Sequence, residues 1–309
     1  MVYNHRWVSL IIPTVNRDDF LVNSLADALS QKYHNYEIIV VDQSNTEISL
    51  KIKEMIRDNA HRLFYYKVKF RGLPEARNFG AQKAKGDILI YIDDDTRFGL
   101  DFIAEHVRTY KLSDRIGLVA GGIDDVVPDI CDRVGCFNKW FCLATRGFGS
   151  KNSQYVDHVP GGNFSIQKNV LLEAGCFAEN LNVGAALYEE LEFCLRSSKL
   201  GCKIYFNANA RVKHLQAPSG GCRIQNDVSY YVFSLAHNRS FLIIRYLSKL
   251  YWITSYFRLS LLFLSYARLA KQMMVIVSGV RGVVYGVKSA KSVIKVSDFD
   301  AKYYERILL

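Results

Sequence analysis

The sequence lacks a long uncharged apolar segment, although 50% of its residues are hydrophobic. In its most apolar part, the longest charge-free pieces between Arg245, Lys249, Arg258 and Arg268 are only 8 and 9 residues long, whereas a helix that spans a bilayer needs about 20. No apolar leader precedes the first strand pattern at Val8. The 7 cysteines are an odd number in a chain of 309 residues, which is long enough to form a core without disulfides. These features favour a reducing, cytosolic compartment.

Acidic residues are scarce in the last quarter of the chain. From Arg223 to the C-terminus, 13 Lys and Arg face only 4 Asp and Glu, so this segment carries nearly all of the net charge of +10. The same segment holds the apolar runs, and Lys288, Lys291 and Lys295 share one helical face. This pattern is typical of a helix that lies in an anionic membrane interface, and it argues against nucleic acid as a partner. A packed helical subdomain or a contact in a homo-oligomer is the alternative interpretation of residues 223–309.

The first hundred residues alternate between aliphatic runs and amphipathic segments. We expect strands at "VSLIIPT", "YEIIVVD", "RLFYYKVK" and "DILIYID", with a helix in each interval. Continuous Ile, Val and Leu runs indicate strands covered on both faces, as in a mainly parallel sheet. Residues 99–215 are less regular, although "YEELEFCLRSSKLG" predicts a further helix. The sequence therefore predicts an α/β domain over residues 1–222, followed by a helical appendage.

Three adjacent aspartates, Asp93, Asp94 and Asp95, follow directly behind an apolar strand. Ligands of parallel sheets bind outside the carboxyl ends of the strands, so Pro13–Arg17, Asp42 and the aspartates should converge on one cleft. Alternation along an extended chain directs Asp93 and Asp95 to one side and Asp94 to the other. Carboxylate oxygens suit Mg²⁺ and Mn²⁺, which share their coordination with substrate phosphates. A D-x-D pair at this edge therefore predicts a metal or phosphate site.

Five sequence blocks together resemble family 2 glycosyltransferases of the GT-A fold. The resemblance covers roughly residues 7–215 and rests on the order and spacing of "SLIIPTVNR", "EIIVVDQSN", "GLPEARNFGAQKAKGDILIYIDDDT", "VPGGNFSIQKNVLLEAGCFAE" and "YEELEFCLRSSKLGCKIYFNANARVKH". It implies a GT-A sheet, a nucleotide-sugar donor and a Mg²⁺ or Mn²⁺ ion that neutralises the leaving diphosphate.

Carried over by position, the resemblance also implies where the donor and the metal bind. Asp95 would be the direct metal ligand, Asp93 would lie near the ribose, and His214 matches a position where some relatives use a further metal ligand. The segment "APSGGCR" after His214 predicts a lid, with Arg223 as a phosphate contact. The implied donor-binding residues are Pro13, Thr14, Arg17, Asp42, Arg77, Asn78, Asp93 and Asp94.

On the acceptor side, the resemblance implies a general base at the start of a helix. Relatives carry Glu-Asp there, and this chain has Glu189-Glu190, so Glu190 is the candidate base, with Glu189 or Glu192 as alternatives. The glycines of Gly161-Gly162-Asn163 match an acceptor-side loop in which small residues let the backbone approach a sugar. An acidic first turn that complements the helix dipole is the purely structural interpretation of the two glutamates.

These features predict a metal-dependent inverting glycosyltransferase that acts in bacterial-type surface polysaccharide or glycolipid assembly. The expected partners are a UDP- or dTDP-type sugar donor, a saccharide or lipid-linked acceptor, and a membrane surface bound through the C-terminal region. We expect a cytoplasmic protein, peripheral at the inner face of the cell membrane. A nucleotidyltransferase on a similar sheet would carry a glycine-rich loop after the first strand, and "PTVNRDD" has no glycine. A non-catalytic scaffold protein that binds nucleotides is the remaining alternative.

Overall fold

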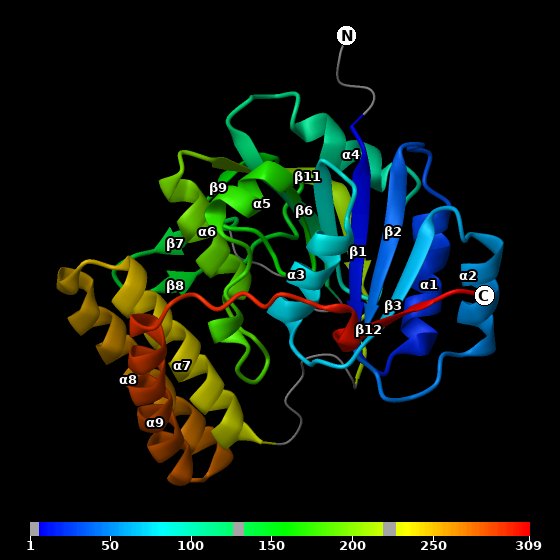
Figure 1. The fold of residues 1–309 in the computed structure, drawn as a ribbon. Helices are drawn as coiled ribbons and strands as arrows, with labels where there is room; N and C mark the ends of the chain where they lie inside the picture. The colour runs from blue at the N-terminus through cyan, green and yellow to red at the C-terminus, as the bar shows by residue number, and fades with distance from the viewer. Residues whose placement is uncertain (1–5, 126–132, 219–226) are drawn as a thin grey trace.

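The computed structural model describes residues 6–125, 133–218 and 227–309 (Figure 1). A twisted, mainly parallel sheet has helices on both faces, and three further helices lie together beside it. The predicted α/β fold class with a helical C-terminal region is therefore confirmed.

The main sheet has the strand order β12-β3-β2-β1-β4-β10-β6-β11-β5, with β9 paired to β11. The strands β3, β2, β1 and β4 are parallel, whereas β10 runs antiparallel between β4 and β6. β7 and β8 form a separate hairpin. The bounds are β1 Val8–Thr14, β2 Tyr36–Asp42, β3 Leu63–Val68, β4 Ile88–Ile92, β5 Thr96–Phe98, β6 Ile116–Asp124, β7 Phe137–Asn138, β8 Leu143–Ala144, β9 Gln154–Val156, β10 Asn163–Gln167, β11 Lys203–His214 and β12 Tyr304–Ile307.

The helices fall between the strands near the positions that apolar periodicity predicts. Three of them begin with the expected acidic or proline residues in their first turn, which favour a helix N-terminus. Their bounds are α1 Asp18–Leu29, α2 Leu50–Asp58, α3 Leu73–Lys83, α4 Phe102–Thr109, α5 Lys168–Ala174, α6 Glu189–Lys199, α7 Val228–Tyr246, α8 Trp252–Ala270 and α9 Met274–Lys291.

Two hydrophobic cores lie on opposite faces of the sheet, because successive strand residues point to opposite sides. In β1, Leu10 and Ile12 join the core under α1, α2 and α4, while Ile11 joins the core under α3 and α5. Both cores hold fully buried aliphatic side chains from β1, β2 and β4. This double coverage explains why these strands read as continuous apolar runs, and it fixes their carboxyl ends at one common edge.

The helices α7, α8 and α9 pack against one another through Val232, Leu259, Phe263 and Val275. Glycines of α9 allow it to approach α7 closely, since a Cβ at Gly282 would lie 2.3 Å from a main-chain carbonyl oxygen of α7. Within the described ranges, every helix is too short or too polar to serve as a membrane span.

The end of the chain returns from α9 to the far edge of the sheet (Figure 1). Phe299 is buried against Phe70 and Phe79, and the strand β12 then pairs antiparallel with β3. The helical character of the region after Arg223 did not predict this strand. Its consequence is that the last residues cover a sheet edge that would otherwise leave main-chain groups unpaired.

Candidate active site

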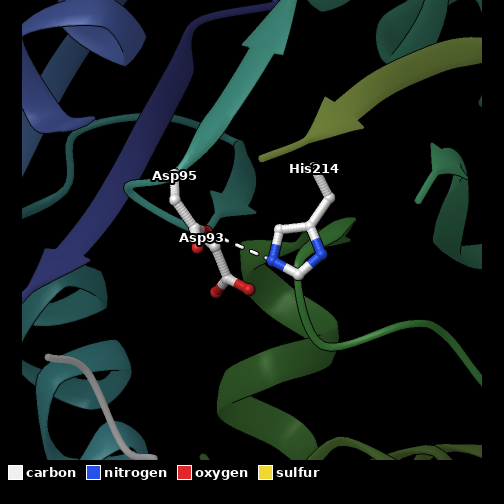
Figure 2. A group of neighbouring side chains, drawn as sticks. All are labelled: Asp93, Asp95 and His214. Atoms are coloured by element: carbon white, nitrogen blue, oxygen red, sulfur yellow. Dashed lines mark ion pairs between the residues drawn. The ribbon is translucent and has the colours of Figure 1, made fainter. Parts of the chain in front are cut away.

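The carboxyl ends of β1 and β4 meet next to the end of β11, as the parallel arrangement requires. Asp93, Asp95 and His214 each offer one ligand atom there, and these atoms all lie within 4.8 Å of one another. Figure 2 shows the two carboxylates and the imidazole ring pointing toward one another. Two carboxylates and one imidazole nitrogen are suitable ligands for a divalent ion such as Mn²⁺. The donor set thus fits the metal that the sequence led us to expect.

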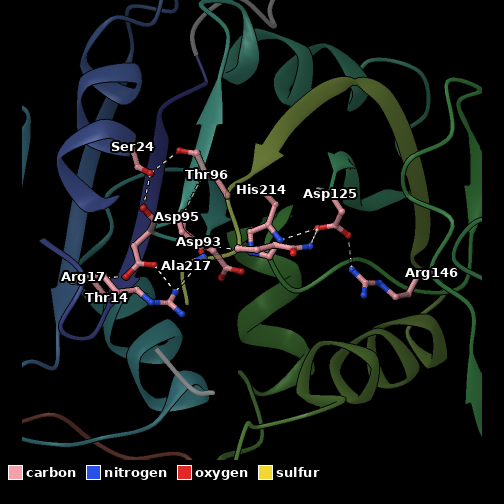
Figure 3. A network of polar contacts seen from close by, with 12 residues as sticks. Thr14, Arg17, Ser24, Asp93, Asp95, Thr96, Asp125, Arg146, His214 and Ala217 are labelled. Atoms are coloured by element: carbon pink, nitrogen blue, oxygen red, sulfur yellow. Dashed lines mark hydrogen bonds and ion pairs between the residues drawn. The ribbon is translucent and has the colours of Figure 1, made fainter. Parts of the chain in front are cut away.

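The side chain of Asp94, the middle aspartate of the triplet, contacts the end of β1 and the residues that follow it. Asp94 accepts hydrogen bonds from the Thr14 hydroxyl at 2.7 Å and from Arg17 at 2.9 Å. Burial raises the pKa of Asp94 to about 6, although Arg17 and Thr14 oppose that shift. The Ser24 hydroxyl lies 2.7 Å from the carbonyl oxygens of Asp94 and Thr96, which fixes the turn that carries the triplet (Figure 3).

Asp95 and His214 form a charged pair at 3.3 Å. Burial opposes ionisation of both groups, but their mutual hydrogen bond and opposite charges outweigh it. The pKa of His214 rises to about 9, and the pKa of Asp95, which also accepts a bond from the Ala217 amide at 2.8 Å, falls to about 2. Burial and the charge of Asp95 raise the pKa of Asp93. Without a metal, His214 and Arg17, which lies 3.5 Å from Asp95, balance the negative charge of this cluster.

Two adjoining cavities meet at this cluster. The first, of about 250 Å³, is lined by Pro13, Thr14, Arg17 and all three aspartates, and also by Gln43. The second, of about 430 Å³, is lined by Gly161, Gly162 and Glu190. Asp93 and His214 belong to both linings. A molecule in one cavity would consequently face a molecule in the other across Asp93 and His214.

The three glutamates at the start of α6 have different surroundings. Glu189 is fully buried and forms an ion pair with Arg77. Glu192 is also fully buried, and both of its oxygens bind Arg196 at 2.8 Å. Glu190 is half-buried on the wall of the second cavity, and it has no ion pair with any residue in the described parts of the chain. Glu190 is therefore the carboxylate of this group that is placed to meet a ligand.

Several residues expected in the site make hydrogen bonds or ion pairs within the protein next to the two cavities. Asp42 binds the Tyr65 hydroxyl and the Ser44 amide, and Asn78 binds both main-chain groups of Phe177. These two residues, together with Asn163 and Glu189, do not line either of the two cavities.

Asn163 is fully buried and joins three strands of the sheet. Its amide nitrogen donates to the carbonyl oxygens of Gly122 and Ala210, and its amide oxygen lies 3.0 Å from His106. Burial lowers the pKa of His106 to about 4, so the ring is neutral at pH 7 and donates to Asn163. The sequence predicts a lid at residues 217–223, with Arg223 as a phosphate contact. The part of this segment from residue 219 onward, including Arg223, lies outside the described residues.

Sequence reasoning missed three residues at this edge. Gln43 lines the first cavity and accepts a hydrogen bond from the Gly72 amide at 2.7 Å. Asp125 binds His214, and Arg146 binds Asp125. Because Asp125 follows β6 directly, the same rule that singled out the ends of β1 and β4 would have found it. Arg146 lies in an irregular loop, where no pattern marks it.

The sheet order and the position of the aspartates at the carboxyl ends of its strands are those of the GT-A fold. Solved structures with this fold include GalNAc-T7 with UDP, GalNAc and Mn²⁺, at 22% identity and a TM-score of 0.62, covering 78% of this chain and 50% of that one. They also include the mannosyltransferase PcManGT from Pyrobaculum calidifontis with GDP-Man and Mn²⁺, at 14% identity and a TM-score of 0.55, covering 93% and 86%.

Sequence comparisons agree with the fold. Residues 9–128 match the family described as glycosyl transferase family 2. Among curated relatives, the glucosyl-dolichyl phosphate glucuronosyltransferase of Haloferax volcanii is 27% identical over 218 residues, which are 67% of this chain and 68% of that protein. The N-terminal part of the chain, residues 9–128, is therefore similar to family 2 of the glycosyltransferases.

Proposed function

We propose that the protein is a metal-dependent, inverting glycosyltransferase that moves a sugar from a nucleotide donor to an acceptor hydroxyl. The observation that carries this proposal is the pair of cavities that share Asp93 and His214, because only the second one contains Glu190. A donor in the first cavity and an acceptor in the second would place the anomeric carbon between the metal cluster and a carboxylate base. This arrangement suits a single in-line displacement.

The proposed donor site is the first cavity. Thr14, Arg17, Gln43 and the three aspartates line it. The ion held by Asp93, Asp95 and His214, Mn²⁺ or Mg²⁺, would supply positive charge against the diphosphate. The two neighbouring structures named above contain Mn²⁺ together with UDP or GDP-Man, which supports this choice of cofactor and of donor class. We propose a UDP- or dTDP-type donor.

In the proposed reaction, Glu190 accepts the proton of the acceptor hydroxyl. The acceptor oxygen then bonds to the anomeric carbon, and the bond from that carbon to the phosphate oxygen breaks, so a nucleoside diphosphate leaves. General base catalysis of this kind contributes about 10²- to 10⁴-fold to the rate. Because the base and the diphosphate lie on opposite sides of the sugar, the anomeric configuration inverts.

The test is a panel of UDP-, dTDP- and GDP-sugars assayed for hydrolysis and transfer with Mn²⁺ or Mg²⁺. Glu190→Gln should lower transfer at least about 10²-fold and should leave the stabilisation by donor and Mn²⁺ in place, since it keeps the metal cluster. Asp95→Ala should abolish the metal-dependent rise in melting temperature. Glu173→Gln, at an exposed position on α5, is the matched control. Wild-type turnover in Glu190→Gln would reject this residue as the base.

We further propose that the protein works at an anionic membrane surface on a lipid-linked acceptor, in surface polysaccharide or glycolipid assembly. The segment 228–297 contains no acidic residue, yet it contains ten Lys and Arg. Large apolar side chains are exposed on α8 and α9, and Tyr231 of α7 lines the second cavity. The name of the Haloferax relative includes a dolichyl phosphate, which is a lipid-linked group. The exposed apolar residues on these two helices are Ile253, Phe257, Leu261, Leu264, Leu269, Met274, Val277, Val280, Val284 and Tyr285.

Vesicle sedimentation tests this membrane contact and its dependence on charge. The full chain should bind vesicles containing phosphatidylglycerol at low salt and be released at high salt, because the attraction to anionic lipid is screened. Ile253→Asp with Phe257→Asp should weaken binding, because both side chains are exposed on α8. Leu172→Asp is the matched control on α5, where the side chain is equally exposed but distant in the fold. A change of oligomeric state in the α8 variant, with vesicle binding unchanged, would instead assign this face to self-association.

A further inference from the structure

His214 contacts a second carboxylate on the side of the ring that faces away from Asp95. Its Nδ1 lies 2.8 Å from Oδ1 of Asp125, while its Nε2 lies 3.3 Å from Oδ1 of Asp95 (Figure 3). Each ring nitrogen therefore has its own carboxylate, one in the metal cluster and one outside it. This arrangement fixes the plane of the ring and assigns Nε2 to the metal cluster.

The side chain of Asp125 also contacts Arg146 and Gln216. Oδ2 of Asp125 accepts a hydrogen bond from Arg146 at 2.9 Å, and Gln216 lies 3.4 Å from Oδ1. The side chain of Asp125 is only 9% exposed, whereas that of Arg146 is 69% exposed. Arg146 also lines the second cavity, in which we place the acceptor. A chain of contacts thus runs from the wall of the acceptor cavity through Arg146 and Asp125 to the ring of His214.

We propose that Asp125 is a positioning residue for the metal site, and that Arg146 fixes Asp125 in this role. This inference rests on the proposed metal dependence. A histidine that binds a metal through Nε2 must keep its proton on Nδ1, and a carboxylate that accepts this proton both selects the tautomer and makes Nε2 a better ligand. Loss of such a partner typically weakens metal binding about 10- to 100-fold. Asp125 therefore contributes to metal affinity without contacting the metal.

The neighbouring aspartate provides a matched control. Asp124 has the same chemistry and is one residue away, but its carboxylate binds Arg211 at 2.7 Å and Lys151 at 3.3 Å. If Asp125 had a purely structural role, its loss would lower the melting temperature without a specific loss of metal affinity. A positioning role makes only Asp125 important for metal affinity.

The experiment measures the dissociation constant of Mn²⁺ alone on the full chain, from the electron paramagnetic resonance signal of free Mn²⁺. Asp125→Ala should weaken Mn²⁺ binding about 10- to 100-fold, and Asp125→Asn should weaken it less, because an amide oxygen still accepts the Nδ1 proton without carrying charge. Asp124→Ala should bind Mn²⁺ like the wild type. Melting temperatures of all variants separate lost affinity from lost folding. If Asp125→Ala does not fold, Asp125→Asn and Arg146→Met replace it.

A double-mutant cycle shows whether Asp125 acts through His214. In a His214→Ala background, Asp125→Ala should cause no further loss of Mn²⁺ affinity, because the ring that it positions is gone. Equal losses in both backgrounds, or wild-type affinity in Asp125→Ala, would overturn the proposal while the metal site itself stands. A wild-type protein that binds no Mn²⁺ would overturn both this inference and the proposed metal dependence.

Discussion

The buried ion pair between Arg77 and Glu189 predicts that Glu189 and its neighbour Glu190 respond differently to the same substitution. Arg77 reaches from α3 to the start of α6, and the side chains of both residues are at most 2% exposed. Solvent cannot compensate a charge at this depth, so removing one partner leaves the other ion uncompensated. Glu189→Gln keeps the shape and a hydrogen-bond acceptor, but it removes the negative charge.

We expect Glu189→Gln to lower the free energy of unfolding by about 3 kcal/mol, the lower end of the range for breaking a buried pair. The lower end applies because Arg77 keeps a hydrogen bond of 2.6 Å to the carbonyl oxygen of Gly161 and its contacts with two aromatic rings, centred 5.1 and 5.7 Å away. Such a loss corresponds to a fall of roughly 6–12 °C in melting temperature. Glu190→Gln, the same change one residue later, should alter stability by less than about 0.5 kcal/mol.

Urea unfolding followed by circular dichroism measures both variants, with Arg77→Met and the double variant completing a cycle. The double variant should be more stable than the sum of the two single losses predicts, since no unpaired charge remains. If Glu189→Gln costs less than about 1 kcal/mol, as exposed pairs do, the pair is not buried in solution. In that case the assignment of Glu189 to the framework and of Glu190 to chemistry fails.

Three further outcomes follow from packing and burial. Gly162→Ala should lower Mn²⁺-dependent turnover by up to about 10²-fold, because its Cβ would lie 2.7 Å from the Asp93 carboxylate. Gly161→Ala meets only ordinary contacts and should bind Mn²⁺ like the wild type. Burial raises the pKa of Glu75 from 4.5 to about 7 in the folded protein. The free energy of unfolding should therefore fall as the pH rises from 4.5 to 7, because the unfolded chain loses this proton more readily. When urea unfolding is compared at pH 5 and pH 8, Glu75→Gln should remove up to about 3 kcal/mol of this pH dependence. Gly282→Ala should lower the melting temperature by pushing α9 away from α7, and an unchanged value would refute the close approach of these helices.

Periodicity and strand ends predicted much of the fold and located the candidate site. The continuous apolar runs of β1, β2 and β4 require cover on both faces, and that requirement sets a parallel sheet with one functional edge. Asp93, Asp95 and His214 each stand at the end of a strand at that edge, so the order of the strands brings them together. Local sequence contains this information because each residue is placed by its own strand.

Roles that depend on distant partners could not be read from local sequence. Glu189 and Glu190 are chemically identical neighbours, and they differ only because Arg77, more than a hundred residues earlier, neutralises one of them. The short strand β12 has no strand signal of its own and forms because the edge of β3 is available for pairing. Asn163 was expected beside a sugar. Its amide nitrogen donates hydrogen bonds to two neighbouring strands, and its amide oxygen contacts His106.

Two of the three carboxylates in the acidic triplet are compensated by protein groups without a metal. Asp94 is bound by Arg17 and Thr14, and Asp95 is bound by His214 and the Ala217 amide. Asp93 has a raised pKa, and it is the member of the triplet that faces both cavities. A divalent ion would take the place of the proton on Nε2 of His214, whose ring is already oriented by Asp125. The fold thus commits Asp94 to the framework and leaves Asp93 and Asp95 facing the position proposed for the cation.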